Sequence, residues 1–226
     1  MSEINVEQAR YNMIEQQIRP WEVLDQHVLD VLSTVRREEF VPARYRRLAF
    51  TDVRIPLGHG QSMMNPNIEG RLLQALAIRS GDAVLEIGTG SGYLTACLAS
   101  LGRHVTSIDI YPDFIERAQQ TLAQNKLMNI RLESGDASME WAPDQANYGE
   151  HYFDAIAITG ALPYLSDSWR QRLALGGRLF AIVGEAPVME ALLVTRTEEH
   201  AWLTESLFET ELLYLVNSAP APLFEF

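Results

Sequence analysis

The chain has 226 residues, of which 47% are hydrophobic and 21% are charged, a composition typical of a globular protein. A chain of this length buries about 70% of its unfolded surface, so we predict a single domain over residues 1–226. The formal net charge of −12 disfavours a nucleic-acid partner, because an acidic protein repels phosphate backbones. We expect no membrane partner and a cytoplasmic location, since no apolar run approaches the ~18 residues of a membrane span and residues 1–10 lack a secretion signal.

The residue types that commonly bind metals give no metal site. Cys97 is the only cysteine and lies in an apolar run, where it is expected to pack as a small hydrophobe. None of the five histidines has a partner at metal-ligand spacing, so each is interpreted as a surface or packing residue. The arginines at 36, 37, 44, 46 and 47 are interleaved with Glu38 and Glu39, and we interpret them as solvated helix faces.

Residues 1–79 are expected to form an N-terminal helical extension with a substrate loop. Apolar residues recur at helical spacing on either side of Pro20, and Asp25 is placed to cap the second helix. The sequence predicts, in order, a helix over 6–18, a helix that begins at Asp25 and is ended by 40–42, an irregular loop or short strand over 52–66, and a helix from about Asn67.

Residues 80–226 alternate short apolar strands with longer helical segments, the pattern of βαβ units around a parallel sheet. The expected strands are 83–87, 105–108, 130–133, 153–158 and 178–183, and the expected helices are 92–100, 112–126 and 169–173. Two further extended runs, 191–197 and 207–216, predict an antiparallel hairpin at the sheet edge. The fold class is therefore α/β, a doubly wound, mostly parallel, seven-stranded Rossmann-like sheet that forms the cofactor-binding core.

A glycine-rich turn follows the first strand of this core. Gly88, Gly90 and Gly92 alternate along the turn, whereas a simple strand-to-helix turn needs about one glycine. Asp109 ends the next strand, seventeen residues beyond Gly92. A carboxylate at that position can accept hydrogen bonds from both ribose hydroxyls of a nucleoside that lies across the two strands.

Two details favour a methyl donor over a nicotinamide dinucleotide. The glycines are spaced G-x-G-x-G, and Glu86 precedes them. An anion beside the turn suits a cationic ammonium or sulfonium group and opposes a pyrophosphate. After the third strand, Asp136 can accept a hydrogen bond from the exocyclic amine of adenine.

The segment from Val84 to Tyr93, VLEIGTGSGY, resembles the first motif of class I methyltransferases, and most closely that of the protein-L-isoaspartate O-methyltransferase family. Further similar segments are FDAI leading to Thr159, LGGRL at 175–179, VG at 183–184, FVP at 40–42 and LGHGQ at 57–61. The resemblance covers roughly residues 12–216.

The resemblance implies S-adenosylmethionine as cofactor, with S-adenosylhomocysteine as its product. It implies cofactor contacts from Ser62, Glu86, Gly88, Thr89, Gly90, Gly92, Asp109, Ile110, Asp136, Ala137 and Thr159. It also implies methylation of the α-carboxylate of isoaspartyl residues in damaged proteins, the first step of their repair. The expected partner is therefore a protein or peptide with such a residue. Its carboxylate, with a pKa of about 4, is already ionised and needs no general base.

The substrate side departs from the family pattern. The family's loop usually reads G-x-G-Q-T-I-S-x-P, with a serine hydroxyl at the junction of cofactor and substrate. In this chain Ser62 keeps a hydroxyl at the threonine position, but Met64 replaces that serine and cannot donate a hydrogen bond. Leu213 stands where the family tends to carry arginine. We therefore treat Ser62 and Met64 as candidate catalytic-site residues.

Three hypotheses remain open from the sequence. The first is isoaspartyl methylation, which the overall resemblance favours. The second is a methyltransferase with another acceptor, which Met64 and Leu213 favour. The third is a cofactor-binding protein without turnover, which the retention of Glu86, Asp109 and Asp136 disfavours.

Overall fold

A computed structural model describes residues 5–138 and 152–219. The main sheet has seven strands in the order β5-β4-β3-β6-β7-β8-β9. Strands β3 to β7 are parallel, and β8 and β9 follow as antiparallel neighbours. The strands are β3 (Ala83–Ile87), β4 (His104–Asp109), β5 (Ile130–Ser134), β6 (Phe153–Leu162), β7 (Leu173–Glu185), β8 (Val188–Glu198) and β9 (Ala201–Thr210). The mostly parallel seven-stranded sheet expected from the sequence is confirmed.

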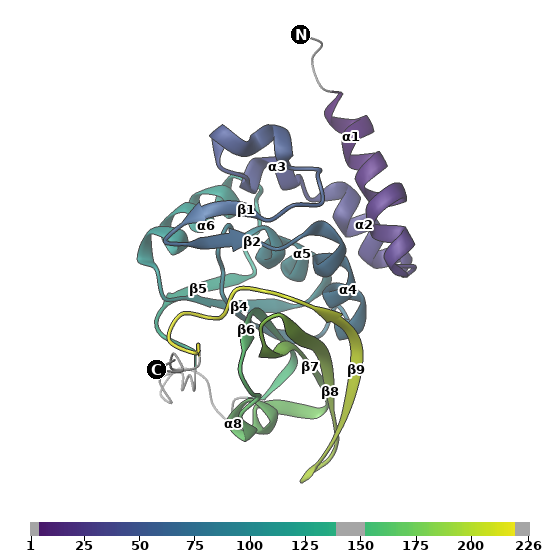
Figure 1. Cartoon of the computed structure of the whole chain (residues 1–226), viewed down its shortest axis with the longest axis vertical. Helices are drawn as coiled ribbons and strands as arrows, with labels where there is room; N and C mark the ends of the chain where they lie inside the picture. Colours follow the sequence, from purple (N-terminus) through teal and green to yellow (C-terminus); the bar gives the residue numbers. More distant parts are fainter. Residues whose placement is uncertain (1–4, 139–151, 220–226) are drawn as a thin grey trace, which may run out of the picture.

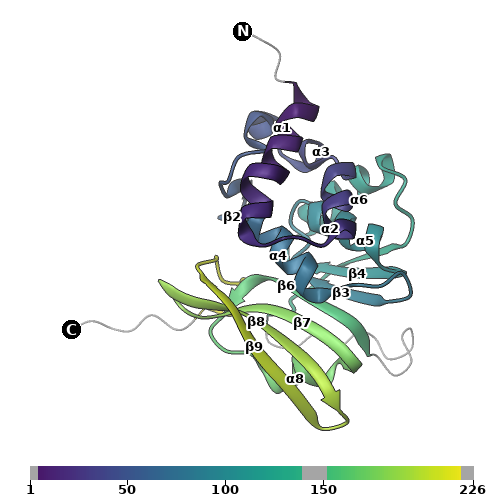
Figure 2. The same cartoon turned by 90° about the vertical axis from the view of Figure 1, so that its right-hand side faces the viewer.

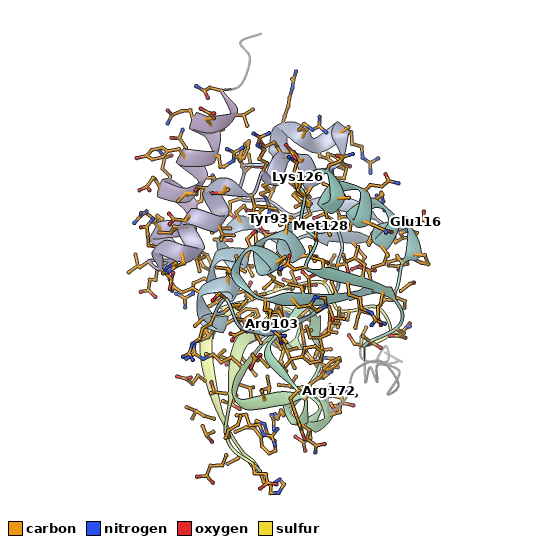
Figure 3. The ribbon with its side chains drawn as sticks, turned by 180° about the vertical axis from the view of Figure 1, so that it is seen from behind. Tyr93, Arg103, Glu116, Lys126, Met128 and Arg172 are labelled. Carbon is orange, nitrogen blue, oxygen red and sulfur yellow. The ribbon has the colours of Figure 1, made fainter. Side chains whose placement is uncertain are left out.

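Helices cover both faces of the sheet, because successive strand residues point to opposite sides and both sides are apolar. One face packs against α4 (Pro66–Leu76), α5 (Tyr93–Leu101) and α6 (Pro112–Gln124). The other face packs around Trp169 of α8 (Asp167–Gln171). Seen from behind, Tyr93 lies in the interior whereas Glu116 projects outward from α6 (Figure 3). Cys97 is fully buried, as expected for a core residue.

The N-terminal extension lies on the side of the sheet that α4, α5 and α6 cover (Figure 1). It consists of α1 (Val6–Met13), a π-helical turn η1 (Ile14–Ile18), a 3-10 turn η2 (Arg19–Trp21), α2 (Gln26–Thr34), α3 (Arg37–Phe40) and a 3-10 segment η3 (Ala43–Leu48). Asp25 caps α2 as predicted, and its Oδ1 accepts hydrogen bonds from the N–H groups of His27 and Val28 at 2.8 and 3.3 Å. The expectation that this helix runs to 40–42 is wrong, since Val35 has an extended backbone and α3 is separate.

The substrate loop forms a two-stranded hairpin of β1 (Ile55–Gly58) and β2 (Gln61–Met63), joined at His59 and Gly60. Both joining residues have positive φ angles, 51° and 71°, as a tight antiparallel turn requires. Residues of the hairpin line the same cavity as residues at the carboxyl ends of β3 and β4.

The C-terminal hairpin is present, but its second strand is not where the sequence predicted it. Strand β8 includes the expected run 191–197, whereas β9 ends at Thr210. Residues beyond it return to β6, where the N–H of Ala161 donates to the carbonyl of Leu213 and the N–H of Leu215 donates to the carbonyl of Ala161. The apolar run 207–216 is therefore divided between an edge strand and a return segment. In side view, β7, β8 and β9 extend from the core as a long twisted ribbon (Figure 2).

Candidate cofactor and acceptor site

A cavity lies at the carboxyl ends of β3, β4, β5 and β6, where the strand order reverses between β3 and β6. Ligands of open α/β sheets bind at this kind of switch point. The β1–β2 hairpin and the return segment 212–216 complete its walls. Ten of the sequence-predicted site residues line it: Ser62, Met64, Gly88, Thr89, Gly90, Asp109, Ile110, Asp136, Ala137 and Thr159.

Gly88 and Gly90 of the glycine-rich turn line the cavity, and the space beside Gly88 is occupied by Thr159. Gly88 has a φ of 96°, and a Cβ added to it would lie 2.3 Å from Oγ1 of Thr159. Thr159 in turn donates to the carbonyls of Ile87 and Gly88, both at 2.8 Å. Gly92 has a different function, because its added Cβ would lie 3.0 Å from Cβ of Ala118. Gly92 thus permits α5 to pack against α6 and does not face the cavity, contrary to the sequence-based expectation.

Asp109 connects the end of β4 to the glycine turn. Its Oδ2 accepts from the N–H of Gly90 at 2.8 Å, and its Oδ1 accepts from the N–H of Tyr111 at 2.9 Å. Burial raises the pKa of Asp109, and these two backbone hydrogen bonds oppose the rise. Each carboxylate oxygen retains a further lone pair. Asp109 can therefore hold the turn and still accept a hydrogen bond from a ligand hydroxyl.

Asp136 lies at the far end of the cavity, where the return segment meets β5. Its Oδ1 accepts from the N–H of Ser138 at 3.0 Å, and its Oδ2 accepts from the Asn217 side chain at 2.7 Å. Burial favours a higher pKa, but these hydrogen bonds outweigh it and lower the pKa of Asp136. The sequence offered no signal for Asn217, because its partner is 81 residues away.

Glu86 is placed differently from the sequence-based expectation. It is fully buried beneath the turn, and its Oε2 accepts from Oγ1 of Thr95 and Oγ of Ser107, both at 2.5 Å. Among the residues that the structure describes, none donates a hydrogen bond to its Oε1. Burial raises the pKa of Glu86 to about 8, so the carboxyl group is largely neutral at pH 7. Glu86 connects to the cavity through Ser107, whose hydroxyl lies 2.6 Å from that of Thr89.

Arg37 is not on a solvated helix face, and that interpretation is wrong. Its guanidinium is fully buried, and each of its three nitrogens has an acceptor. Nε donates to the carbonyl of Ala49 at 3.0 Å, Nη2 donates to the carbonyl of Met64 at 2.8 Å, and Nη1 pairs with Glu69. Glu69 itself lines the cavity. Burial raises the pKa of Glu69, and the attraction of Arg37 opposes the rise.

His59 holds the tip of the β1–β2 hairpin against the start of α6. Its ring stacks on Tyr111 with centroids 4.1 Å apart and an interplanar angle of 10°. Its Nε2 lies 3.0 Å from Oδ1 of Asp113, which also pairs with Arg117 at 2.6 Å. Tyr111 lines the cavity, so the stack supports one wall from outside.

Within the two described ranges, no group of three or more histidine, cysteine, aspartate or glutamate residues is placed to hold a metal ion. Over the same ranges, no helix combines the length and apolar character needed to cross a membrane.

Comparison with known proteins identifies the family. Residues 8–218 match the family model of protein-L-isoaspartate(D-aspartate) O-methyltransferase. The chain belongs to this family. A protein-L-isoaspartate O-methyltransferase 1 of Rhodopseudomonas palustris is 36% identical over 209 residues, which cover 92% of this chain and 83% of the relative. The protein-L-isoaspartate O-methyltransferase of Gloeobacter violaceus is 35% identical, and the match covers 92% of this chain and 98% of that relative.

Solved structures show the same fold. A protein-L-isoaspartate O-methyltransferase from Plasmodium falciparum, in complex with S-adenosyl-L-homocysteine, has a TM-score of 0.77 at 18% identity, over 94% of this chain and 99% of that one. The class I methyltransferase fold is therefore confirmed. So is the enzyme class, since this family consists of S-adenosylmethionine-dependent methyltransferases.

The two residues that depart from the isoaspartyl methyltransferase pattern both line the cavity. Met64 is 5% exposed, and Met63 beside it is 4% exposed. Both methionines contribute to the cavity wall at the hairpin end, and Leu213 contributes from the return segment. The part of the cavity formed by Met63, Met64 and Leu213 is thus more apolar than the family pattern implies.

Proposed function

We propose that this protein transfers the methyl group of S-adenosylmethionine to the α-carboxylate of isoaspartyl residues in damaged proteins or peptides. The main support is that the glycine turn, Asp109 and the hairpin residues Ser62 and Met64 all line one cavity, in a chain that belongs to this family. A role in protein repair in the cytoplasm stays a prediction.

In this proposal the cofactor lies across the ends of β3, β4 and β5. Its methionine portion lies against Gly88 and Gly90, with Ser62 and Thr159 beside it, and all four residues line the cavity. Asp109 accepts from the ribose hydroxyls, and Asp136 accepts from the adenine amine. Ile110 and Ala137 supply apolar contacts beside the base.

Methyl transfer to a carboxylate requires little proton chemistry from the protein. The acceptor is an anion at neutral pH and the bound cofactor supplies an electrophilic methyl group on a sulfonium, so charge is neutralised as the bond forms. The protein's contribution is alignment of the two groups and exclusion of water. Met63, Met64 and Leu213 are the apolar side chains that exclude water at the acceptor end.

The direct test is a methyl-transfer assay with a synthetic isoaspartyl peptide and the same peptide containing normal aspartate. We expect methyl ester on the isoaspartyl peptide alone, because the family reaction uses its α-carboxylate. Asp109→Ala serves as a control with impaired cofactor binding. Absence of transfer to the isoaspartyl peptide by a protein that binds S-adenosylhomocysteine would show that the acceptor is different.

Met64→Ser should raise turnover on the isoaspartyl peptide. A serine hydroxyl can donate a hydrogen bond made mainly in the transition state, equivalent to about 1.4 to 2.7 kcal/mol or roughly 10- to 100-fold in rate. Calorimetry should show little change in S-adenosylhomocysteine affinity, since the change lies on the acceptor side.

Met63→Ser is the matched control, because Met63 is equally buried and also lines the cavity. It should give no gain. If Met64→Ser also gives none, Met64 is not the residue that limits the rate.

A further inference from the structure

A buried ion pair of Arg37 and Glu69 lies beside the cavity and links the N-terminal extension to α4. Arg37 lies on α3 of the N-terminal extension, and Glu69 lies in the first turns of α4. Glu69 is 3% exposed, and Arg37 is fully buried. A buried guanidinium is costly to desolvate unless its donors are used, and here each nitrogen has an acceptor.

Two of the three acceptors of Arg37 belong to residues that line the cavity. One is the carbonyl of Met64, whose side chain lines the acceptor end. Another is Glu69, which lines the same cavity. The planar guanidinium therefore fixes the backbone of the acceptor loop relative to α4.

Arg37 also contacts Tyr93, the residue that directly follows the glycine turn. Its guanidinium carbon lies 4.7 Å from the ring centroid of Tyr93, at cation–π distance. Tyr93 is the first residue of α5, directly after the glycine turn. One side chain thus contacts both the segment that ends the turn and the loop that carries Met64.

We propose that Arg37 is a positioning residue for methyl transfer, which holds the acceptor loop in register with the glycine turn through Met64, Glu69 and Tyr93. This inference rests on the proposed function, because it concerns alignment of the acceptor with the methyl donor. Displacement of about 1 Å between reacting groups can reduce turnover 100-fold. Loss of Arg37 should therefore lower turnover more than it lowers cofactor affinity.

The test compares Arg37→Lys with Arg10→Lys in the full chain. Lysine can pair with Glu69 but cannot donate in the fixed planar geometry that reaches Met64 and Ala49. Arg10 is a matched control, since it pairs with Glu38 at 2.5 Å and lies 5.7 Å from the ring centroid of Phe50, with 13% of its side chain exposed. No Arg10 atom contributes to the cavity lining.

We expect turnover of Arg37→Lys on the isoaspartyl peptide to fall ~10- to 100-fold, measured well below its melting temperature. Its dissociation constant for S-adenosylhomocysteine should change by less than about 2-fold, as expected for a hydrogen bond that the ligand does not share. Arg10→Lys should keep wild-type turnover. A purely structural role would lower the melting temperature of both variants and leave turnover of the folded enzyme unchanged.

Glu69→Gln decides the question if Arg37→Lys does not fold. It keeps an acceptor oxygen for Arg37 but removes the countercharge, so turnover should fall about 2- to 10-fold with cofactor affinity preserved. If whichever of Arg37→Lys and Glu69→Gln folds has the same turnover as Arg10→Lys, the inference about Arg37 is overturned and the proposed function still stands. A wild-type protein without activity on the peptide overturns the proposed function and the inference together.

Discussion

Asp109 is in contact with both structural components of the cofactor half of the site, the end of β4 and the glycine turn. We expect Asp109→Ala to weaken S-adenosylhomocysteine binding by about 1 to 3 kcal/mol, or ~5- to 150-fold, because ribose hydroxyls lose their acceptor in a largely desolvated site. Isothermal titration measures the effect. Asp82→Ala is the control, since Asp82 accepts from the N–H of Arg79 and precedes the amino end of β3, whereas Asp109 is at the carboxyl end of β4. Equal affinities in the two variants would remove Asp109 from the ribose site.

The burial of Glu86 should make the protein less stable as pH rises. Burial raises its pKa in the folded protein to about 8, from an ordinary value of 4.5. Between these values the folded state holds a proton that the unfolded state has lost, so the free energy of unfolding falls as pH rises. The slope is on the order of 1.4 kcal/mol per pH unit within that window.

Glu86→Gln should remove this slope, since glutamine does not ionise and its amide oxygen can accept from Thr95 and Ser107. The variant should therefore gain stability relative to wild type between pH 5 and pH 8.5, about the ends of the window. Urea unfolding at the two pH values measures the gain. A constant difference between the two proteins would show that Glu86 ionises normally in the folded state.

At the scale of elements, the tip of the β1–β2 hairpin contacts the start of α6 through the stack of His59 on Tyr111 and the contact of His59 with Asp113. His59→Asn should raise the dissociation rate of S-adenosylhomocysteine ~2- to 10-fold, because the stack on Tyr111 contributes about 0.5 to 1.5 kcal/mol. Asparagine tolerates the positive φ of 51°, so the turn itself is preserved. Stopped-flow displacement measures the rate.

His27→Asn is the control for the hairpin, because His27 lies on α2 with 92% of its side chain exposed. It should dissociate the ligand at the wild-type rate. If the two variants behave alike, the hairpin does not retain the cofactor.

The elements of the core could be predicted because each is determined locally. Parallel strands buried on both faces give short apolar runs, and a cap such as Asp25 gives a defined helix start. The end of β9 could not be predicted in this way. The residues beyond Thr210 are apolar because they line the cavity and pair with β6, and a strand pattern looks the same.

The same reasoning separates the site residues that sequence could identify from those it could not. Gly88 and Asp109 occur at fixed positions relative to strand ends, so the motif places them. Arg37 depends on carbonyl groups 12 and 27 residues away, and nothing in its local sequence indicates burial. The motif places Glu86 directly before the glycine turn. The side of β3 that it faces depends on the polar groups of Thr95 and Ser107, which are distant in sequence.

At the scale of the whole molecule, the net charge of −12 should influence which damaged peptides are methylated fastest. Isoaspartyl peptides with lysine or arginine neighbours should have kcat/KM values roughly 10-fold above those with acidic neighbours at low ionic strength. The difference should shrink at about 0.3 M salt, because screening shortens the range of the field. Equal values at low salt for peptides that share one isoaspartyl core would exclude electrostatic selection.

The cavity takes its walls from segments far apart in the chain, from Leu57 of the hairpin to Val216 of the return segment. During synthesis, the glycine turn and Asp109 emerge long before Asn217 reaches Asp136. A nascent chain that ends after β7 thus carries the motif by which the family is identified but lacks a wall of the site. Cofactor binding therefore depends on synthesis of the return segment, and the bound ligand stabilises chains that include it over chains that end earlier.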